Sequence, residues 1–401
     1  MRKRLAAARR VASKRRSPLY LVGGAVRDLL LGRPVADIDL AVEGDGVVFA
    51  RALARELGAR PRPHERFGTG TLEFPDGSRL DIASTRAETY EARGALPRVA
   101  AAPLGRDLAR RDFTINAIAL RLAPRRRPVL IDPFGGARDI GSGTIRMLHE
   151  NSPQDDPTRA FRAVRYANRL RFRIDPSTRR WIGQAAHHGA FDGVSGDRMR
   201  RELRLLFSEP DRATAVRLMG ALGIDRMVDP DLRHDERVLA SLRRAEAIAR
   251  RHPGQTTWLL FLLVWSGELD PSARERLSRR LSLAGEADRR LRSFSALLGD
   301  LREDPSRVVP STLLERVTDR DEIAAAAAHL GGTAGRRLER ALRVSSTRLQ
   351  IRGRDLIAAG IAAGPRIGRA LKVTLAARRD GRISSSGELA FAIREARRTA
   401  S

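Results

Sequence analysis

The spacing of the apolar residues changes near residue 146, and this change limits most strongly what the chain can fold into. Before that point, short apolar runs alternate with turn residues. Leu19–Val22 is such a run, and the segment 71–83 has the pattern of a hairpin around a Pro-Asp-Gly-Ser turn. Beyond it, apolar residues recur three and four positions apart, as at Met199, Leu203 and Leu206. The pattern predicts an α+β chain, with a mixed sheet and helices over residues 17–145 and an all-α remainder.

Local signals place the elements of the first part. The strand at 19–22 meets Gly23-Gly24 and then a helix over 25–31, which Gly32 closes. Residues 37–42 alternate and then become apolar, as in a half-buried strand. The segment 110–120 fits a helix. In the remainder, Pro and Gly mark candidate joints near 208–212, 252–254, 304–310 and 331–335.

The chain is strongly basic, with 76 Lys and Arg against 48 Asp and Glu, a formal net charge of +28. This excess indicates a phosphate-rich partner, because each neutralised phosphate releases counterions. A GC-rich genome would also enrich arginine, but it would not by itself leave the charge so unbalanced.

Other features restrict the class of protein. The chain contains no cysteine, which excludes disulfides and Cys-zinc sites. Its longest apolar run, Trp258–Trp265, is too short to span a bilayer. Residues 1–16 carry eight basic residues and no acid, with no apolar stretch after them, which is unlike a secretory signal. We expect a cytoplasmic protein with a basic N-terminal arm, either solvated or in contact with RNA.

Asp37 and Asp39 are the first candidate metal ligands. Side chains two apart on a strand project to the same face, and two adjacent carboxylates repel each other unless a cation lies between them. Oxygen ligands suit Mg²⁺, although most Asp-x-Asp pairs are solvated surface. The Gly23-Gly24 turn lies fourteen residues upstream of Asp37 and offers backbone N–H groups to a phosphate, or is only a tight turn. Asp81 is a third candidate carboxylate, with Leu80 and Ile82 facing the core; a surface aspartate is the alternative.

These residues resemble a known family. The segment 21–32, followed by Asp37-Ile38-Asp39, is similar to the first motif of class II tRNA nucleotidyltransferases, which bacterial poly(A) polymerases share. Further segments continue the likeness in the same order: 80–90, 110–119, 132–136, 155–162, 194–202, 353–357 and 364–365. The likeness is close over residues 20–205, whereas residues 206–340 match only in their helical character.

The resemblance implies a polymerase-β-like nucleotidyltransferase head followed by an all-α neck, body and tail. The implied parts are a basic arm at 1–16, the catalytic head at 17–145, the neck at 146–207, the body at 208–335 and the tail at 336–401.

The resemblance also implies site roles in two-metal catalysis. Asp37 and Asp39 would hold two Mg²⁺ ions, and Asp81 would be the third catalytic carboxylate. The nucleotide's triphosphate and sugar would lie among Gly23, Gly24, Arg27, Asp28, Arg110, Arg111, Asp112 and Asn116. On the predicted helix, Asp112 and Asn116 share a face, which suits a common target or a contact within the helix.

Asp156 and Arg159 are candidates for choosing the base, with Arg162 in support. Cytosine and adenine both present an amino donor beside a ring-nitrogen acceptor. A carboxylate only accepts hydrogen bonds and a guanidinium only donates them, so the pair would admit C and A and reject U and G. The alternative is that Asp156-Pro157 simply starts a helix. Position 155 is Asp where the family usually has Glu, and position 153 is Pro where an aromatic residue is common.

The resemblance implies ATP and CTP as substrates and the acceptor and TΨC arms of tRNA as partner, with no protein partner or membrane. Candidate RNA-binding residues are Arg198, Arg201, Arg352 and Arg354. The activity would be CCA addition, with A-only, CC-only and poly(A) addition as alternatives, and the loop 91–104 is expected to control the switch from C to A. A catalytically silent RNA-binding protein is the alternative of another class; the intact Asp37 and Asp39 argue against it.

Overall fold

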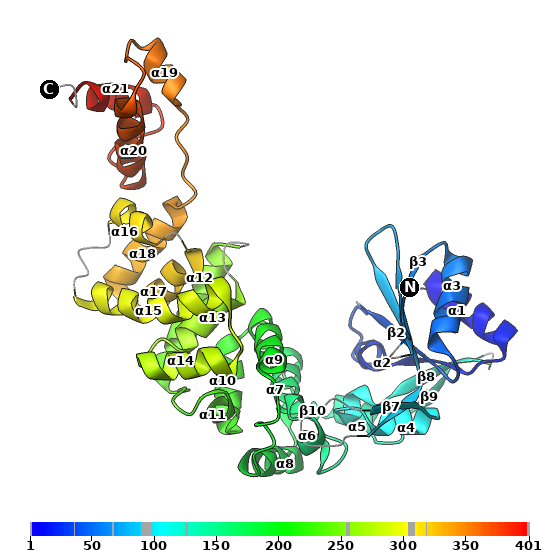
Figure 1. The fold of residues 1–401 in the computed structure, drawn as a ribbon. Coiled ribbons are helices and arrows are strands. Elements are labelled where there is room, and N and C mark those ends of the chain that lie inside the picture. The colour runs from blue at the N-terminus through cyan, green and yellow to red at the C-terminus, as the bar shows by residue number, and fades with distance from the viewer. Residues whose placement is uncertain are drawn as a thin grey trace. The chain divides into compact units, whose positions relative to one another are not determined.

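The structure is a computed structural model that describes residues 2–35, 37–65, 68–89, 98–124, 127–253, 257–303, 309–317 and 319–398. Its contacts divide the chain into two compact units, residues 1–198 with 222–224 and residues 199–221 with 225–401 (Figure 1). The boundary falls within helix α9 (Gly196–Ser208). None of the described helices is long and apolar enough to cross a membrane.

The first unit is built on a seven-stranded mixed sheet in the order β3-β4-β5-β2-β1-β8-β9. Its strands are β1 (Leu19–Val22), β2 (Ile38–Val42), β3 (Arg60–His64), β4 (Thr69–Glu73), β5 (Arg79–Ser84), β8 (Ala119–Ala123) and β9 (Val129–Ile131). Strands β2 and β5 pair in parallel, while the other neighbours are antiparallel. The predicted mixed sheet is therefore confirmed, as is the hairpin of β4 and β5.

Helices cover both faces of this sheet. They are α1 (Arg2–Arg15), α2 (Gly24–Leu30), α3 (Gly46–Leu57) and α4 (Leu104–Ala109), and a separate hairpin is formed by β6 (Arg86–Thr89) and β7 (Arg98–Ala101). On one face, α4 packs on Tyr20, Val22 and Ala41. Helix α3 packs on β3, β4 and β5. Leu80 and Ile82 are fully buried, as their alternation with Asp81 predicted.

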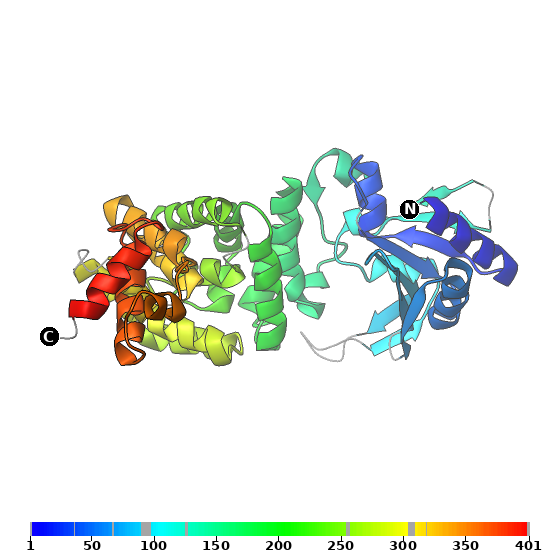
Figure 2. The same cartoon turned by 90° about the horizontal axis from the view of Figure 1, so that it is seen from above.

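The segment that the charge pattern sets apart as a basic arm forms helix α1, which lies beside α3 (Figure 1 and Figure 2). Small residues spaced three and four apart form its buried stripe, namely Ala7, Ala8, Val11 and Ala12. Arg10 reaches Glu56 of α3 at 2.9 Å. The basic side chains of α1 are thus presented from a packed helix.

The predicted helix over 110–120 is wrong. Helix α4 ends at Ala109, residues 114–116 form the single 3-10 turn η2 (Thr114–Asn116), and β8 begins at Ala119. Phe113, Ile115 and Ile118 are all fully buried, so the segment has no polar face for a surface helix to expose. Pairing of β8 with β1 in the middle of the sheet decides the conformation over local propensity.

Beyond the sheet, the first unit becomes helical as predicted. It contains α5 (Gly136–Gly141), α6 (Ser152–Asp155), α7 (Thr158–Leu170) and α8 (Pro176–His187), with the short strands β10 (Thr144–Ile145) and β11 (Arg173–Ile174) paired in parallel. Helix α7 buries Phe161, Val164 and Leu170, the residues whose spacing predicted it.

Among its described residues, the second unit is helical throughout. After α9 it contains α10 (Arg212–Ala221), α11 (Ile224–Val228), α12 (Glu236–Arg251), α13 (Trp258–Trp265), α14 (Pro271–Arg280), α15 (Gly285–Glu303), α16 (Pro310–Arg316), α17 (Arg320–Leu330), α18 (Gly332–Val344), α19 (Gly353–Ala358), α20 (Pro365–Arg379) and α21 (Glu388–Arg398). Helix α13, apolar on all sides, is buried from Leu259 to Trp265. Helices α19 to α21 share a small core of their own around Leu356 and Ile367.

His329 of α17 is a buried base in the second unit. Its Nε2 lies 2.9 Å from the carbonyl oxygen of Val264, and only 4% of its side chain is exposed. Burial lowers the pKa of His329 to about 4, against the opposing charge of Glu268. The folded protein therefore holds this ring neutral where the unfolded chain would protonate it.

Stability should therefore fall on acidification. Between about pH 6.5 and 4 the unfolded state binds a proton that the folded state does not, which costs about 3 kcal/mol once complete. We expect urea denaturation, followed by tryptophan fluorescence, to show a smaller loss across this window in His329→Gln than in the wild type. His64→Gln, at an exposed strand position, is the control. Equal pH slopes in His329→Gln and wild type would contradict the assignment.

Candidate active site

A pair of carboxylates lies at the centre of the sheet. In the parallel register of β2 and β5, Asp39 is directly opposite Asp81, so their side chains share a face. Both line a pocket of about 280 Å³, together with Thr71, whose Oγ1 donates to Asp81 Oδ1 at 2.6 Å. Asp37 lies just before β2 and is exposed. The sequence spacing predicted that Asp37 and Asp39 lie on one face. In the sheet, the direct neighbour of Asp39 is Asp81.

The charges of this pair suit a cation. Burial, together with the negative charges of Asp81 and Asp37, raises the pKa of Asp39 to about 6 against the opposing charge of Arg111. The positive charge of nearby residues therefore does not balance these carboxylates. Hard oxygen ligands of this kind suit Mg²⁺. Over the described ranges, no three His, Cys, Asp or Glu side chains group closely enough to hold an ion.

The glycine turn lies beside these carboxylates. Gly23 has a φ of +66° at the start of α2, a conformation that favours glycine. A Cβ at Gly23 would lie 2.9 Å from Arg111 Nη1 and 3.9 Å from Asp39 Oδ2. Glycine thus allows the guanidinium of Arg111 to approach both the backbone turn and the acid. The turn, Arg111 and Asp39 therefore form one site.

Asp107 pairs with both Arg110 and Arg111, and the sequence patterns did not identify it as a site residue. Its Oδ1 accepts from Arg110 Nη2 at 2.7 Å and its Oδ2 from Arg111 Nη2 at 2.9 Å. Glu88 accepts a further bond from Arg110 Nη1 at 2.6 Å. Burial would raise the pKa of Asp107, but Arg111 and Arg110 hold it below its ordinary value. The available signal was an acid three and four residues before adjacent arginines on a helix.

A second group of predicted residues forms a hydrogen-bonded network. Asn116 Nδ2 donates to Asp112 Oδ1 at 3.0 Å, and Asn116 Oδ1 accepts from Arg27 Nη1 at 2.8 Å. Arg162 donates to Asp112 Oδ2 through Nε and Nη2, at 2.8 and 2.6 Å. Arg27 Nε also donates to Asp28 Oδ1 at 2.9 Å. Asp112 and Asn116 do meet, but across the η2 turn rather than along an α-helix.

Tyr166 of α7 lies at the centre of this network and was also missed. Four guanidiniums lie 5.2 to 5.5 Å from its ring centroid, those of Arg27, Arg162, Arg165 and Arg169. Its hydroxyl accepts from Arg162 at 3.3 Å, and its ring meets Phe113 edge-on. A ring face attracts cations, so Tyr166 helps to keep these arginines together. Its position four residues after Arg162 was the only sequence signal.

The predicted base-choosing residues are both engaged within the protein. Asp156 Oδ1 accepts from the Thr158 backbone N–H at 3.0 Å, from the Thr158 hydroxyl at 2.6 Å and from Arg198 Nη2 at 2.7 Å. The carboxylate therefore holds the turn that leads into α7, whose N-cap is Pro157. This is close to the simpler of the two interpretations, in which Asp156-Pro157 only starts a helix. Among the described residues, the other oxygen of Asp156, Oδ2, accepts no hydrogen bond.

Arg159 is buried beside Arg110. Its Nη1 donates to Ser152 Oγ at 2.7 Å and its Nη2 to the carbonyl oxygen of Arg110 at 2.8 Å. The network that begins at Asp39 and Arg111 therefore continues through Arg110 to Arg159. Asp155, at the position where the family usually has Glu, lies at the end of α6.

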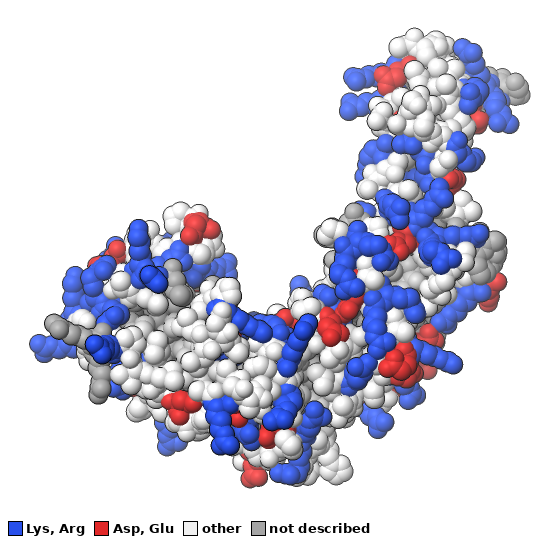
Figure 3. All heavy atoms as spheres, turned by 180° about the vertical axis from the view of Figure 1, so that it is seen from behind, with Lys and Arg blue, Asp and Glu red and all other residues white. Residues whose placement is uncertain are grey.

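The four predicted RNA-binding arginines fall in different environments. Arg198 is paired with Asp156 in the first unit, whereas Arg201, Arg352 and Arg354 are exposed in the second. Figure 3 shows Lys and Arg side chains over the surface of both units. Residues 90–97 lie outside the described residues, and they include the first half of the loop 91–104 that is expected to control the switch from C to A.

The chain is similar to several known proteins in sequence and in fold. Residues 19–146 match the family model of the poly(A) polymerase head domain. The A-adding tRNA nucleotidyltransferase of Geobacter sulfurreducens is 47% identical over 54% of this chain and 24% of its own length. The CC-adding tRNA nucleotidyltransferase of Deinococcus radiodurans is 32% identical over 95% of this chain and 91% of its own length. The Thermotoga maritima CCA-adding enzyme complexed with tRNA is 30% identical, with a TM-score of 0.77 over 100% of this chain and 95% of its own.

The shared length differs between relatives. The alignments cover 24%, 48% and 35% of three A-adding relatives, from Geobacter sulfurreducens, Halalkalibacterium halodurans and Aquifex aeolicus. The chain therefore spans less than half the length of these proteins.

Replacing Asp107 with Asn should destabilise the first unit. We expect the free energy of unfolding to fall by about 3 kcal/mol, because removing one partner of a buried ion pair leaves Arg111 without its carboxylate and Arg110 with Glu88 alone. Urea denaturation followed by circular dichroism would measure this. Asp76→Asn, which removes an exposed pairing with Arg4, is the control and should change nothing measurable. Equal stability of the two variants would show that Asp107 does not hold the arginines.

Proposed function

The chain belongs to the class II tRNA nucleotidyltransferase family, and we propose that it adds C residues, A residues or both, from CTP and ATP, to the 3′ end of tRNA without a nucleic-acid template. The observation that carries the proposal is the Asp39–Asp81 pair beside the Gly23 turn and Arg111. The names of the relatives, which are A-adding, CC-adding and CCA-adding enzymes, support it.

The carboxylates fit Mg²⁺, because burial and acidic neighbours raise the pKa of Asp39, and a cation beside it would relieve this excess of negative charge. In the proposal Asp37 and Asp39 hold two ions, and Asp81 completes the acidic face. When bound, the metal would supply positive charge near the attacking 3′ oxygen and the departing pyrophosphate. Arg111, held by Asp107, adds a fixed positive charge on the turn side of Asp39.

The triphosphate is proposed to bind where the glycine turn meets the arginines. Gly23 and Gly24 present backbone N–H groups without a side chain in the way, and Arg27 and Asp28 follow on α2. Asp112 and Asn116 act as positioning residues, because they hold the guanidiniums of Arg162 and Arg27. An arrangement fixed before the substrate arrives needs little rearrangement during the reaction.

Base choice is proposed to rest on Asp156 and Arg159, with Arg162 in support. Asp156 Oδ2 accepts no hydrogen bond among the described residues and can accept from the amino group of C or A. Arg159 would donate to the ring nitrogen beside it. Arg198 pairs with the other oxygen of Asp156, Oδ1, and so keeps the carboxylate oriented. U and G would present the reverse order of donor and acceptor, at the cost of an unpaired polar edge.

The number and kind of nucleotides added separate four related activities. Relatives named A-adding favour A-only addition, whereas the Deinococcus radiodurans relative that aligns over 95% of this chain is named CC-adding. Complete CCA addition and poly(A) addition are the other outcomes, and a silent RNA-binding protein would incorporate nothing. The same assay distinguishes all five.

The assay supplies tRNA that ends before CCA, or at CC, with labelled CTP or ATP and Mg²⁺, and resolves products to single nucleotides. We expect Asp39→Asn to lower incorporation by about a thousandfold, because one of the paired oxyanions is lost. Filter binding should show unchanged tRNA affinity. Asp76→Asn serves as the matched surface control. Incorporation by Asp39→Asn at the wild-type rate would refute the catalytic assignment.

Arg159→Ala should relax the choice of base. We expect the ratio of kcat/KM for ATP or CTP to that for GTP or UTP to fall by about tenfold or more, since one mismatched hydrogen bond no longer opposes the wrong base. Arg55→Ala, at an exposed position of α3, is the control. A purely structural role for Arg159 predicts that kcat/KM falls by the same factor for all four nucleotides. That result would eliminate the base-choosing account.

A further inference from the structure

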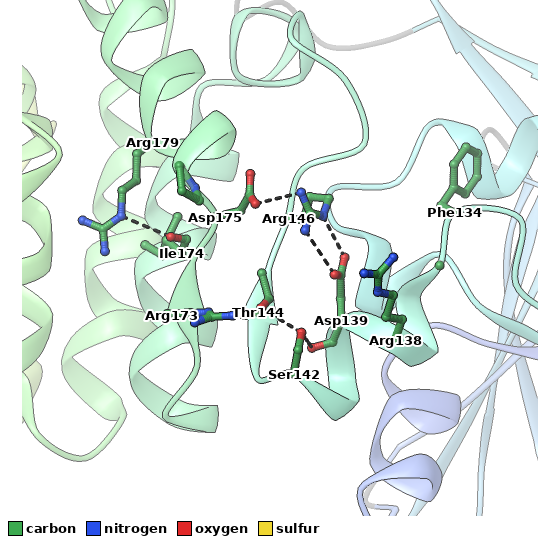
Figure 4. Close-up of a pocket in the computed structure, with 12 residues that line it drawn as sticks. Phe134, Arg138, Asp139, Ser142, Thr144, Arg146, Arg173, Ile174, Asp175 and Arg179 are labelled. Atoms are coloured by element: carbon green, nitrogen blue, oxygen red, sulfur yellow. Dashed lines mark hydrogen bonds and ion pairs between the residues drawn. The ribbon is translucent and has the colours of Figure 1, made fainter.

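The first unit contains a second basic site, separate from the carboxylate pocket. It is a cleft of about 860 Å³ lined by α5, β10, β11 and the start of α8, and none of its residues lines the carboxylate pocket. We name it the α5–α8 cleft. Four arginines and two aspartates line it: Arg138, Arg146, Arg173, Arg179, Asp139 and Asp175 (Figure 4).

Both acids of the cleft are committed to structural contacts. Arg146 bridges them, with Nε 3.1 Å from Asp139 Oδ2 and Nη1 2.7 Å from Asp175 Oδ2. Asp139 also accepts from the Thr114 hydroxyl, and Asp175 caps α8 through the Ser177 N–H. Both carboxylates are nearly buried and share Arg146, so the four arginines less the two aspartates leave the cleft with a net charge of +2.

The remaining arginines keep their charge exposed. Within the part of the chain that the structure describes, Arg138 and Arg173 have no acidic partner, and Arg179 donates through Nε only to the carbonyl oxygen of Ile174. In the view of Figure 4, Arg138 and Arg173 lie on opposite sides of Asp139 and Thr144. Three exposed guanidiniums around a cleft of net charge +2 produce a positive potential that favours a polyanion.

The lining favours phosphates over bases. The hydroxyls of Ser142 and Thr144 lie 2.9 Å apart in the cleft and supply small hydrogen-bonding groups. Phe134 is the one aromatic residue of the lining, and its ring packs against the core around Tyr20 and Leu104. This contact leaves the ring only partly exposed, so the arginines rather than an aromatic face dominate the lining. Contacts of this kind position a nucleic acid without reading its sequence.

We propose that the α5–α8 cleft binds the phosphate backbone of an RNA, with Arg138 and Arg173 as the principal contacts. The inference rests on the proposed function for the identity of that RNA, which is tRNA. The cleft adds affinity for the body of the substrate, while the carboxylate pocket acts on its 3′ end. Arg146 is a positioning residue that keeps the two walls of the cleft together.

The test is a double variant, Arg138→Gln with Arg173→Gln, in the full chain. Fluorescence anisotropy would follow tRNA binding at several salt concentrations. We expect affinity to fall by about tenfold at low salt, and the slope of log K against log salt to decrease by about 2, since two phosphate contacts are lost. The conservative Arg138→Lys with Arg173→Lys should restore most of the slope. Arg55→Gln, an exposed arginine on α3, is the matched control.

Kinetics separates this site from the catalytic one. The double Gln variant should raise the KM for tRNA and leave the KM for ATP and CTP unchanged. A raised KM for the nucleotide would assign the cleft to a small phosphate ligand and overturn the RNA proposal. An unchanged salt slope would overturn it as well. If the wild type incorporates nothing but the slope still changes, the proposed activity fails while the cleft stands as an RNA site.

Discussion

The parallel pairing of β2 with β5 is the constraint on which the site depends. It brings Asp39 and Asp81 opposite each other on one face, although a hairpin and α3 separate them in sequence. Leu80 and Ile82, fully buried on the other face, fix this register, because a slip of one residue would exchange the two faces. The hydrophobic core therefore determines where the two carboxylates lie. The burial of these apolar residues offsets the mutual repulsion of the two carboxylates.

Counter-charge reaches these acids through a chain of contacts. Gly23 leaves room for Arg111 beside Asp39, and Asp107 holds both Arg111 and Arg110. The carbonyl oxygen of Arg110 accepts from Arg159, which links the sheet to α7. Each residue of this chain of contacts is held by the next. A substitution of Asp107 therefore alters the site by moving Arg110 and Arg111, without Asp107 itself contacting the substrate. Positioning of this kind is what a reaction driven by charge neutralisation requires.

Sequence patterns predicted the local elements of this site well and the contacts between them poorly. The strands at 19–22 and 37–42 and the buried Leu80 and Ile82 follow from period-two alternation. The helix expected at 110–120 failed because the segment is buried on all sides and its end pairs with β1. Asp107 pairs with arginines three and four residues further on, a local signal that was not used. Tyr166 was missed because Arg27 and Phe113 meet it only in the fold. Local pattern says nothing of such partners.

The two basic regions of the first unit differ in how their charges are used. Around Tyr166, Arg27 and Arg162 have carboxylate partners in Asp28 and Asp112, which fix their geometry and reduce their long-range field. In the α5–α8 cleft the acids both pair with Arg146, and the exposed Arg138 has no acidic partner among the residues that the structure describes. Paired guanidiniums suit a ligand that must be held at one orientation, whereas unpaired ones suit attraction of a polyanion from solution. A catalyst acting on the end of a large RNA needs both, in separate places.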